Sequence, residues 1–445
     1  MTPHDSVQDS VHDSRVPPAG EAPPLASGTY TDALFHDVLP FWEQYSLDRE
    51  VGGYFTCLTR DGRVFDTDKF IWLQARQVWM YSFLYRVVAQ RPEWLQVAQL
   101  GAGFLLKHGR DENKDWYFSL RRNGRPLVAA YNIFSDCFAT MALAEYAAAA
   151  AMYEHGGAAP AGPGREAGGG ARPGPSSEQA REVALETYRR ILPRRENPKG
   201  RFTKQVSGGR PLHAMALPMI GVNMAMVVQA ALGNEAFSDI DIDPEQEITA
   251  NVERVLDLHL DRAARRLFER VGPNGTHPDC MDGRLLNPGH ACEVLWMIME
   301  AGDQLGRRDW IDTSTEALLW TVEHGWDRRY GGLYYYQDAQ GFPPEKLESD
   351  MKLWWVHAEA IYAFAAAYEY TGSEEHKHWL ERLHSYSWEH FADPEYGEWF
   401  GYLTREGLPS NGLKGGKWKG CFHLPRALLK TGARLQRLEK AGVLS

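Results

Sequence analysis

The chain has 445 residues, of which 44% are hydrophobic, and its formal net charge is −11. The hydrophobic fraction is enough for a sizeable core, and the acidic balance argues against nucleic acid as a partner, because a phosphate backbone needs a basic surface. The five cysteines are scattered and contain no C-x-x-C pair, which indicates reduced thiols and a cytoplasmic location.

Two low-complexity segments and a short C-terminal tail frame the expected domain. Residues 1–28 are rich in proline, serine, aspartate and alanine without an apolar segment, which predicts a disordered tail rather than a signal peptide. Residues 155–177 are largely glycine, proline and alanine and predict an insertion that projects from the fold. With a C-terminal tail over 433–445, residues 29–432 are left as a single catalytic domain.

A short pattern recurs six times along this domain: an aromatic residue near glycine, followed by a polar turn. The six aromatic residues are Phe55, Phe118, Phe202, Phe268, Tyr334 and Phe400. Their spacings are 63, 84, 66, 66 and 66 residues, and the long spacing contains the insertion. The period is therefore nearly constant once the insertion is removed, as in an internal repeat.

Helical runs of two kinds lie between these turns. Some are apolar nearly all round and must be buried on every side, such as 70–88, 133–150 and 351–370. Others, such as 374–391, are amphipathic. The most apolar stretch, 214–233, contains Pro218, Asn223 and Gln229 and lacks flanking aromatic or basic belts, which favours a helix buried in protein over a membrane span.

Six units of one buried helix, one amphipathic helix and one β-hairpin-like turn predict an all-α (α/α)6 barrel. Inner helices would line a bowl and outer helices would cover it, so function is expected at one rim. An irregular helical bundle with accidental spacing is the alternative.

Polar residues that interrupt apolar helices are the first candidates for chemistry. Asn287 can cap a helix whose first turn contains Pro288, so that His290 and Glu293, three residues apart, project from one face. The other interruptions, all near tryptophans, are Arg76, Glu359 and His423.

Several kinds of site fit these residues. A zinc site from His290, Glu293 and His423 would lack the stronger H-E-x-x-H spacing, so no metal is expected. A glycosidase would use Glu293 and Glu359 as its two carboxylates but would leave both histidines without a task. A Cys421–His423 nucleophile is disfavoured, because residues two apart seldom face each other. Each residue also has a purely structural interpretation, as a buried histidine or a buried Arg76–carboxylate pair.

Two imidazoles facing one pocket suit removal and return of a proton at neutral pH. A carbon next to a carbonyl loses its proton only if the enolate oxygen is stabilised, and Arg76 is the candidate for that task. A helix N-terminus would keep His290 neutral, and Glu293 would orient its ring. Two bases on opposite faces of one carbon give an epimerase, whereas one base shared by neighbouring carbons gives an aldose–ketose isomerase; spacing alone leaves both open.

Four motifs, "NPGHACE", "MKLWWVHAEA", "DPEYGEWFGYLTREG" and "KGCFHLPR", resemble the N-acylglucosamine 2-epimerase family, whose animal members are also called renin-binding proteins. The likeness extends from about residue 30 to 432. It implies an (α/α)6 barrel that interconverts N-acetylglucosamine and N-acetylmannosamine by deprotonation and reprotonation at C2. Cellobiose 2-epimerases and mannose isomerases share the barrel, but a further histidine that they usually carry is missing from 215–223 here, which favours the N-acyl-sugar branch.

The resemblance also implies roles for individual residues. It makes His290 and His423 the acid–base pair, and Arg76, Glu293 and Glu359 binders of substrate and intermediate. Trp354, Trp355 and Trp418 would be walls in contact with the sugar. No cofactor is expected for the chemistry, but ATP is expected as an activator, and homodimers are common in the family. A glycine-lysine arrangement that suits a nucleotide, without the Walker spacing, is formed by Gly412, Gly416 and Lys417.

Overall fold

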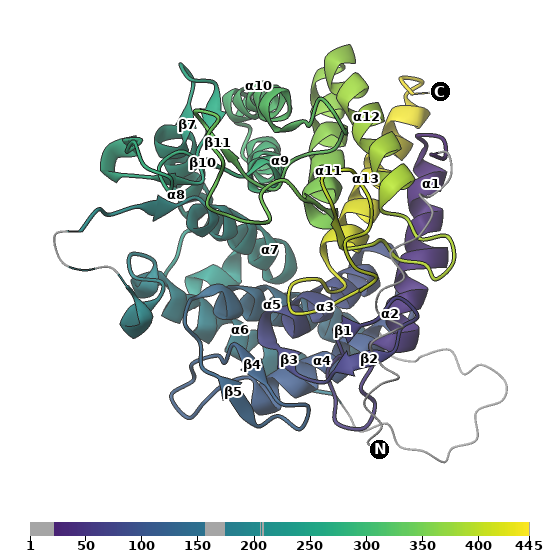
Figure 1. The fold of residues 1–445 in the computed structure, drawn as a ribbon. Helices are drawn as coiled ribbons and strands as arrows, with labels where there is room; N and C mark the ends of the chain where they lie inside the picture. The colour runs from purple at the N-terminus through teal and green to yellow at the C-terminus, as the bar shows by residue number, and fades with distance from the viewer. Residues whose placement is uncertain (1–21, 156–173, 205, 207–208, 445) are drawn as a thin grey trace, which may run out of the picture.

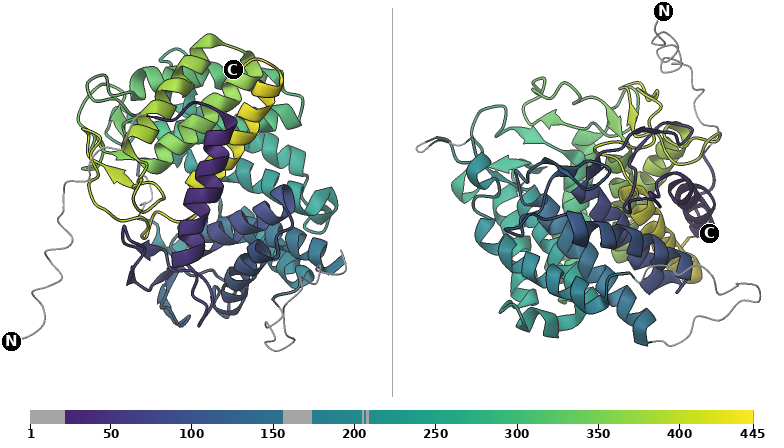
Figure 2. Two further views of the ribbon diagram at one scale, coloured as in Figure 1. Left: turned by 90° about the vertical axis from the view of Figure 1, so that its right-hand side faces the viewer. Right: turned by 90° about the horizontal axis from the view of Figure 1, so that it is seen from below.

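The computed structural model describes residues 22–155, 174–204, 206 and 209–444. Helices alternate between two concentric layers (Figures 1 and 2). The inner helices are α3 (Ile71–Phe83), α5 (Phe134–His155), α7 (Ala216–Ser238), α9 (Pro288–Gln304), α11 (Trp354–Thr371) and α13 (His423–Lys440). The outer layer comprises α1 (Ser27–Asp32) with α2 (Leu39–Tyr45), α4 (Pro92–His108), α6 (Ser177–Ile191), α8 (Pro244–Arg254), α10 (Arg308–Gly325) and α12 (Glu374–His390).

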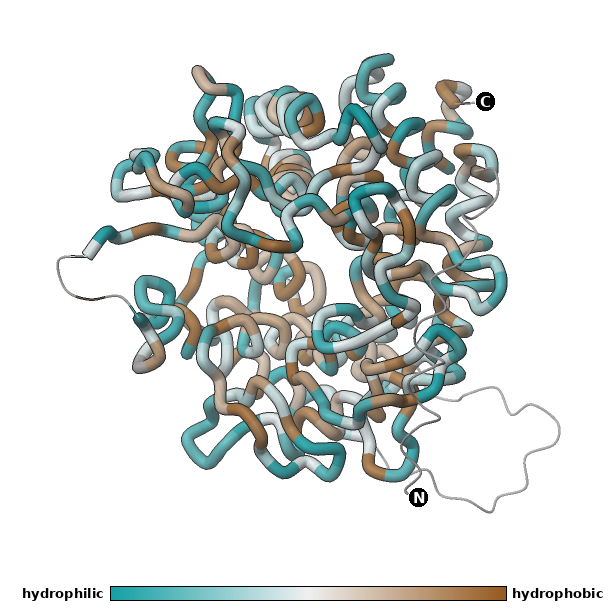
Figure 3. The backbone as a smooth tube through the Cα atoms, viewed as in Figure 1, coloured by the Kyte–Doolittle hydropathy of each residue, from teal (hydrophilic) through white to brown (hydrophobic). Residues whose placement is uncertain are grey.

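Consecutive inner helices pack against each other from α3 to α13, and α13 packs against α1, so the last unit meets the first. This arrangement confirms the predicted (α/α)6 barrel. Apolar residues are concentrated along the inner helices and polar residues along the peripheral loops (Figure 3). In α11 every residue from Trp354 to Tyr368 is buried, as expected for a helix with no polar face.

The apolar stretch predicted as a buried helix is α7. Among the described helices it alone has the length and hydropathy to cross a membrane, yet it packs against α5, α8 and α9 inside the barrel. Gly233, with a φ of 75°, interrupts the helix where the apolar stretch ends.

Short strands gather at the rim, at the top of the right-hand view in Figure 2. Four strands come just before an inner helix and pair with a strand of the next unit, so they tie units together. These pairs are β3 (Lys69–Phe70) with β4 (Ser119–Leu120), β6 (His213–Ala214) with β9 (Arg270–Val271), β10 (Leu285–Leu286) with β11 (Gln337–Asp338) and β12 (Lys352–Leu353) with β13 (Tyr402–Leu403).

Other strands form local hairpins, namely β1 (Cys57–Leu58) with β2 (Val64–Asp66), β4 with β5 (Pro126–Val128), and β7 (Leu260–Asp261) with β8 (Arg266–Leu267). The predicted hairpin-like turns are therefore only part of the strand structure. In five units an antiparallel bridge closes just before the repeated aromatic residue: Leu47–Tyr54, Arg110–Trp116, Leu260–Leu267, Trp326–Leu333 and Ala392–Trp399. The third unit differs, because Phe202 ends a short 3-10 helix.

The domain boundaries need two corrections. Helix α1 begins at Ser27, whose backbone N–H donates to Glu439 at 2.7 Å, so the ordered part of the domain begins before residue 29. Helix α13 continues to Lys440 with Leu435 and Leu438 buried, so the predicted C-terminal tail over 433–445 is wrong. The physical reason is that α13 needs its full length to cover α1 and α11. The N-terminal 21 residues and most of the predicted insertion lie outside the described residues.

Three similar ion clusters join units at the rim. Each contains a buried aspartate that follows an outer helix, a buried lysine later in the chain and an arginine from the next unit: Asp48–Lys69–Arg122, Asp327–Lys352–Arg405 and Asp393–Lys414–Arg60. In the third cluster Arg60 of the first unit binds Asp393 of the last unit at 2.8 Å. This pair closes the ring.

Candidate active site

A cavity of about 660 Å³ opens at the rim, between the N-terminal ends of the inner helices. Its lining includes Arg76 from α3, His290 and Glu293 from α9, and His423 from α13. The structure therefore brings four of the five predicted acid, base and binding residues to one pocket.

The first turn of α9 fixes the position of His290. Asn287 precedes the helix with extended backbone, and its side-chain oxygen accepts a hydrogen bond from the His290 backbone N–H at 3.1 Å. Pro288 occupies the first turn, where a missing N–H costs nothing. The predicted cap is confirmed, and it places the imidazole at the helix end that faces the cavity.

The partner of the His290 ring is Glu269, which lies between β8 and β9. His290 Nδ1 lies 2.9 Å from a carboxylate oxygen of Glu269. An ionised carboxylate only accepts, so Nδ1 carries the proton and Nε2 of the neutral ring has a free lone pair. The expectation that Glu293 orients this ring is wrong, and Glu269 was missed. The signal for it was an acid directly after the repeated aromatic Phe268.

His423 has an equivalent partner in Glu359. Its Nδ1 lies 2.7 Å from Glu359 Oε1, which leaves Nε2 free in the same way. Glu359 is 1% exposed and also accepts a hydrogen bond from Trp296 Nε1 at 2.8 Å. Glu359 does not line the pocket, and its contact with Nδ1 positions the ring of His423. A role for Glu359 in binding substrate or intermediate stays a prediction.

The two histidines have different proton affinities. Burial alone would lower the pKa of His290, but the charge and hydrogen bond of Glu269 outweigh it and raise that pKa above its usual value. Burial, with the nearby charge of Arg76, lowers the pKa of His423 well below its usual value. The carboxylate of Glu269 thus opposes the effect that was expected of the helix N-terminus, and a neutral His290 stays a prediction. The two imidazoles therefore differ in proton affinity, with His290 the stronger proton binder and His423 the weaker one.

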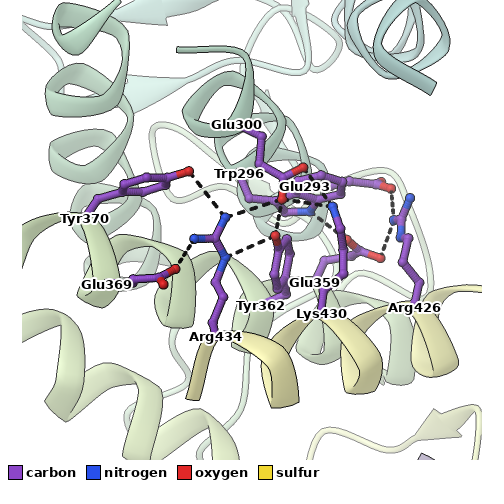
Figure 4. Close-up of polar contacts among 10 residues, drawn as sticks. All are labelled: Glu293, Trp296, Glu300, Glu359, Tyr362, Glu369, Tyr370, Arg426, Lys430 and Arg434. Carbon is purple, nitrogen blue, oxygen red and sulfur yellow. Dashed lines mark hydrogen bonds and ion pairs between the residues drawn. The ribbon is translucent and has the colours of Figure 1, made fainter. Parts of the chain in front are cut away.

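Arg426, three residues after His423, completes the floor of the site. Its Nη2 lies 2.8 Å from Glu293 and 2.7 Å from Glu359, and its side chain is buried (Figure 4). Sequence reasoning missed this residue, although it is the last letter of the "HLPR" motif and shares a helix face with His423. Glu293 Oε2 makes no hydrogen bond within the described residues and is left for a ligand.

The same geometry decides between the alternatives for these carboxylates. Glu293, Glu359 and His423 are close enough to share a metal ion. The Arg426 guanidinium, however, already bridges the two carboxylates, and a second cation there would be repelled. Carboxylates joined through one nitrogen also do not flank a glycosidic bond, which excludes them as a glycosidase pair. Cys421 is buried with a raised pKa and does not line the pocket, so it is no nucleophile.

Further along α13, the same face continues with Lys430 and Arg434. Lys430 binds Glu300 at 2.7 Å, and Arg434 contacts Glu300 and Glu369 (Figure 4). Carboxylates from α9 and α11 thus pair with Arg426, Lys430 and Arg434 of α13. This pairing explains how a helix with a basic face can lie in the inner layer.

Arg76 lies in the pocket, and the structural alternative, a buried Arg76–carboxylate pair, is not found among the described residues. Its guanidinium carbon is 4.4, 4.1 and 4.7 Å from the ring centroids of Trp72, Phe138 and Phe422. Within the described residues no carboxylate lies in ion-pair distance of Arg76, because Arg426 has taken both acids. Burial lowers the pKa of Arg76 to about 9, partly opposed by Glu293. A cation held by aromatic faces alone remains available to an oxygen of a ligand.

The three predicted tryptophans all line the pocket. Trp355 lies between the two histidines, with ring centroids 5.3 Å from His290 and 5.6 Å from His423. Trp354 is buried against Tyr402 of β13, and Trp418 is half-exposed and edge-on to Trp72. Aromatic walls around a polar centre suit the apolar faces of a sugar.

The glycine-lysine loop does not contribute Gly412, Gly416 or Lys417 to the pocket lining. Lys417 is exposed and lies over the rings of Phe118 and Trp418. The loop is anchored by buried Lys414 and Lys419, which bind Asp393 and Glu398.

Comparison with known proteins agrees with this site. The N-acylglucosamine 2-epimerase (GlcNAc 2-epimerase) family matches residues 53–159 and 176–427. The chain is 38% identical to the mouse N-acylglucosamine 2-epimerase and 37% identical to the bovine one, over 91% and 90% of this chain and 91% and 89% of theirs. The cellobiose 2-epimerase of Bacillus thermoamylovorans has the same fold, with a TM-score of 0.72, 20% identity and coverage of 92% and 99%.

The fold, the paired histidines and the similarity to known epimerases together define an (α/α)6-barrel carbohydrate 2-epimerase. The chain belongs to the N-acylglucosamine 2-epimerase family.

Proposed function

We propose that this protein interconverts N-acyl-D-glucosamine and N-acyl-D-mannosamine by moving the proton at C2. One observation carries the proposal: two imidazoles, each fixed at Nδ1 by its own carboxylate, present free Nε2 atoms beside the same indole ring. Two such groups suit the two faces of a single carbon.

The chemistry follows from these positions. In the open-chain sugar the C1 aldehyde acidifies the C2 proton. His423, neutral in the free protein, removes that proton, and Arg76 stabilises the enolate oxygen at C1. His290 then delivers a proton to the opposite face, which inverts C2. In the reverse direction the histidines exchange roles, as microscopic reversibility requires.

An N-acyl substituent favours inversion as the outcome. It leaves no hydroxyl at C2 that could become a ketone, so the enolate can only be reprotonated at carbon. The same site acting on mannose or cellobiose would have a C2 hydroxyl and could also form the ketose.

Incubation in D₂O tests the proposal directly. N-acetylmannosamine, cellobiose and mannose are supplied separately, and NMR follows C2. We expect epimerisation of N-acetylmannosamine with one solvent deuterium at C2 of the product, and slower turnover of the others. Product without solvent deuterium would contradict the two-base mechanism, and preference for cellobiose or mannose would contradict the substrate.

We further propose that ATP activates the enzyme without reacting, through the loop that contains Gly412, Gly416 and Lys417. Support comes from the exposed Lys417 beside the mouth of the pocket. Turnover of N-acetylmannosamine with and without ATP, in the wild type and in Lys417→Ala, is the test.

We also propose that the protein is a homodimer, as the family resemblance implies, and that it is cytoplasmic, as the five free cysteines indicate. Sedimentation analysis and cell fractionation test the two statements separately.

A further inference from the structure

Two neighbouring helices give the pocket a wall without charged side chains. Helices α5 and α7 turn mainly apolar side chains toward it, and Met297 of α9 extends the same surface one turn below Glu293. The apolar members from α5 and α7 are Phe134, Phe138, Ala216, Met219 and Ile220. The charged groups that line the pocket come instead from α3, α9, α13 and, with Glu348, the loop before β12.

This division restricts how the proposed substrate can lie. The histidines of α9 and α13 take the two faces of C2, and Arg76 of α3 takes the oxygen on C1. Two substituents of C2 remain, the hydroxylated chain from C3 and the acyl-amino group. The mouth of the pocket and the uncharged α5–α7 wall offer these substituents two different environments. The hydroxylated chain needs polar partners and water, whereas an acyl group gains from apolar contact.

Asn223 on α7 offers a partner for the amide of that group. Its side chain is 9% exposed and lines the pocket. Its Nδ2 contacts only the sulfur of Met141, at 3.5 Å, and its Oδ1 makes no hydrogen bond within the described residues. A buried carboxamide with so few partners matches the hydrogen-bonding needs of a secondary amide.

We propose that the α5–α7 wall is the subsite for the N-acyl group, with Asn223 at the amide and Met219, Ile220 and Met297 around the acyl chain. The inference rests on the proposed function and deepens it, because it sets the class of acyl group: unbranched, apolar and longer than acetyl. The pocket volume leaves room beyond a monosaccharide, and methionine side chains adapt to chains of different length.

The wild-type enzyme gives the first test. N-acetyl-, N-propanoyl- and N-butanoylglucosamine are compared by kcat/KM. Each added methylene buried against this wall should raise kcat/KM by up to about fourfold. A steady fall with chain length would overturn the subsite, and absence of turnover with every N-acyl sugar would overturn the proposed function as well.

Matched variants give the second test. Met219→Trp and Ile220→Phe narrow the wall and should lower the ratio of butanoyl to acetyl kcat/KM by at least about tenfold. Met351→Trp, which narrows the same pocket from the loop before β12, should leave that ratio unchanged. The ratio cancels general damage, and two narrowing variants guard against one that does not fold. An unchanged ratio in a folded narrowing variant, with N-acetylglucosamine still turned over, would overturn the subsite alone.

The variant Asn223→Leu tests the contact with the substrate amide separately from the contacts with the acyl chain. It should raise KM for all three substrates by about the same factor, of the order of tenfold, because it removes one hydrogen bond in a buried setting. Unchanged KM values would show that Asn223 does not contact the amide.

Discussion

The imidazole of His290 and the carboxylate of Glu269 lie 2.9 Å apart, although 21 positions separate them in the chain. This contact raises the pKa of His290, so we expect Glu269→Gln to lower it. In the direction that needs protonated His290, the alkaline limb of the kcat/KM profile should move to lower pH, and kcat should fall at least about tenfold. Glu348→Gln, a carboxylate elsewhere in the pocket lining, should leave the limb in place. A limb that does not move would mean that Glu269 only supports the fold.

Removal of either histidine should abolish the inversion of C2 but should leave some exchange of the C2 hydrogen with solvent. His290→Asn and His423→Asn should each lose at least ~10² in epimerisation. In D₂O each variant should still exchange the C2 hydrogen of the one epimer that presents it to the remaining imidazole, and the two variants should select opposite epimers. His378→Asn, at an exposed position, is the control. Exchange of the same epimer by both variants would refute the placement of one histidine on each face.

Arg76 should matter for turnover far more than for folding. Arg76→Lys keeps the charge but loses the planar group stacked among three aromatic rings, so kcat should fall by about 10²-fold. The unfolding temperature should change little, since Arg76 has no ion-pair partner within the described residues. Arg49→Lys, at an exposed position, serves as the control. Wild-type kcat in Arg76→Lys would make this residue structural.

Replacement of Arg426, unlike that of Arg76, should have a large effect on the stability of the fold. Arg426→Met leaves Glu293 and Glu359 close together without a cation, which should cost about 3–5 kcal/mol in the free energy of unfolding. Urea unfolding followed by tryptophan fluorescence measures it. Arg437→Met removes an exposed pair with Glu369 and should cost less than about 1 kcal/mol. Equal effects of the two substitutions would contradict the bridging role of Arg426.

The Arg60–Asp393 pair should make stability depend on pH in the acid range. Burial would raise the pKa of Asp393, but Arg60 and Lys414 outweigh it and lower that pKa to about 2. The pair therefore stabilises the fold above about pH 4, and its contribution is lost as pH falls toward 2. Arg60→Ala should destabilise the protein by about 2 kcal/mol at neutral pH. The difference from wild type should shrink as pH falls through about 2, where Asp393 becomes protonated.

Amide hydrogen exchange can distinguish the opening of the ring of helices from the simple loss of one ion pair. Arg60→Ala should increase exchange in α1 and α13, whereas Arg122→Ala, which removes the equivalent arginine between the first two units, should not. The same pattern in both variants would show that Arg60 has no special part in closure.

The sequence predicted the features that depend on local patterns. The near-constant spacing of Phe55, Tyr334 and the other repeated aromatics predicted the barrel, because each repeat is one helical hairpin. Asn287 and Pro288 predicted the start of α9, because capping depends on neighbours in the chain.

Partners distant in the chain were harder to predict. Glu269 reaches His290 only because β6–β9 and β10–β11 hold the rim loops beside α9. Glu293 and Glu359 pair with Arg426 and not with Arg76, although both guanidinium groups lie against the ring of Phe422. Side-chain type alone does not predict which of two arginines pairs with these acids, because the choice depends on the three-dimensional positions of their helices.

The contact of Ser27 with Glu439 has a consequence for chain connectivity. Both the backbone N–H and the hydroxyl of Ser27 bind that carboxylate, at 2.7 and 2.5 Å, so the described ends of the chain lie side by side. Ser177 likewise binds Glu154 across the segment between α5 and α6, at 3.0 Å. A circular permutant that begins at Gly174, ends at His155 and joins residue 444 to residue 22 through a short linker would thus keep every described helix next to its present neighbours. The order of units along the chain could change while their order around the ring stayed the same.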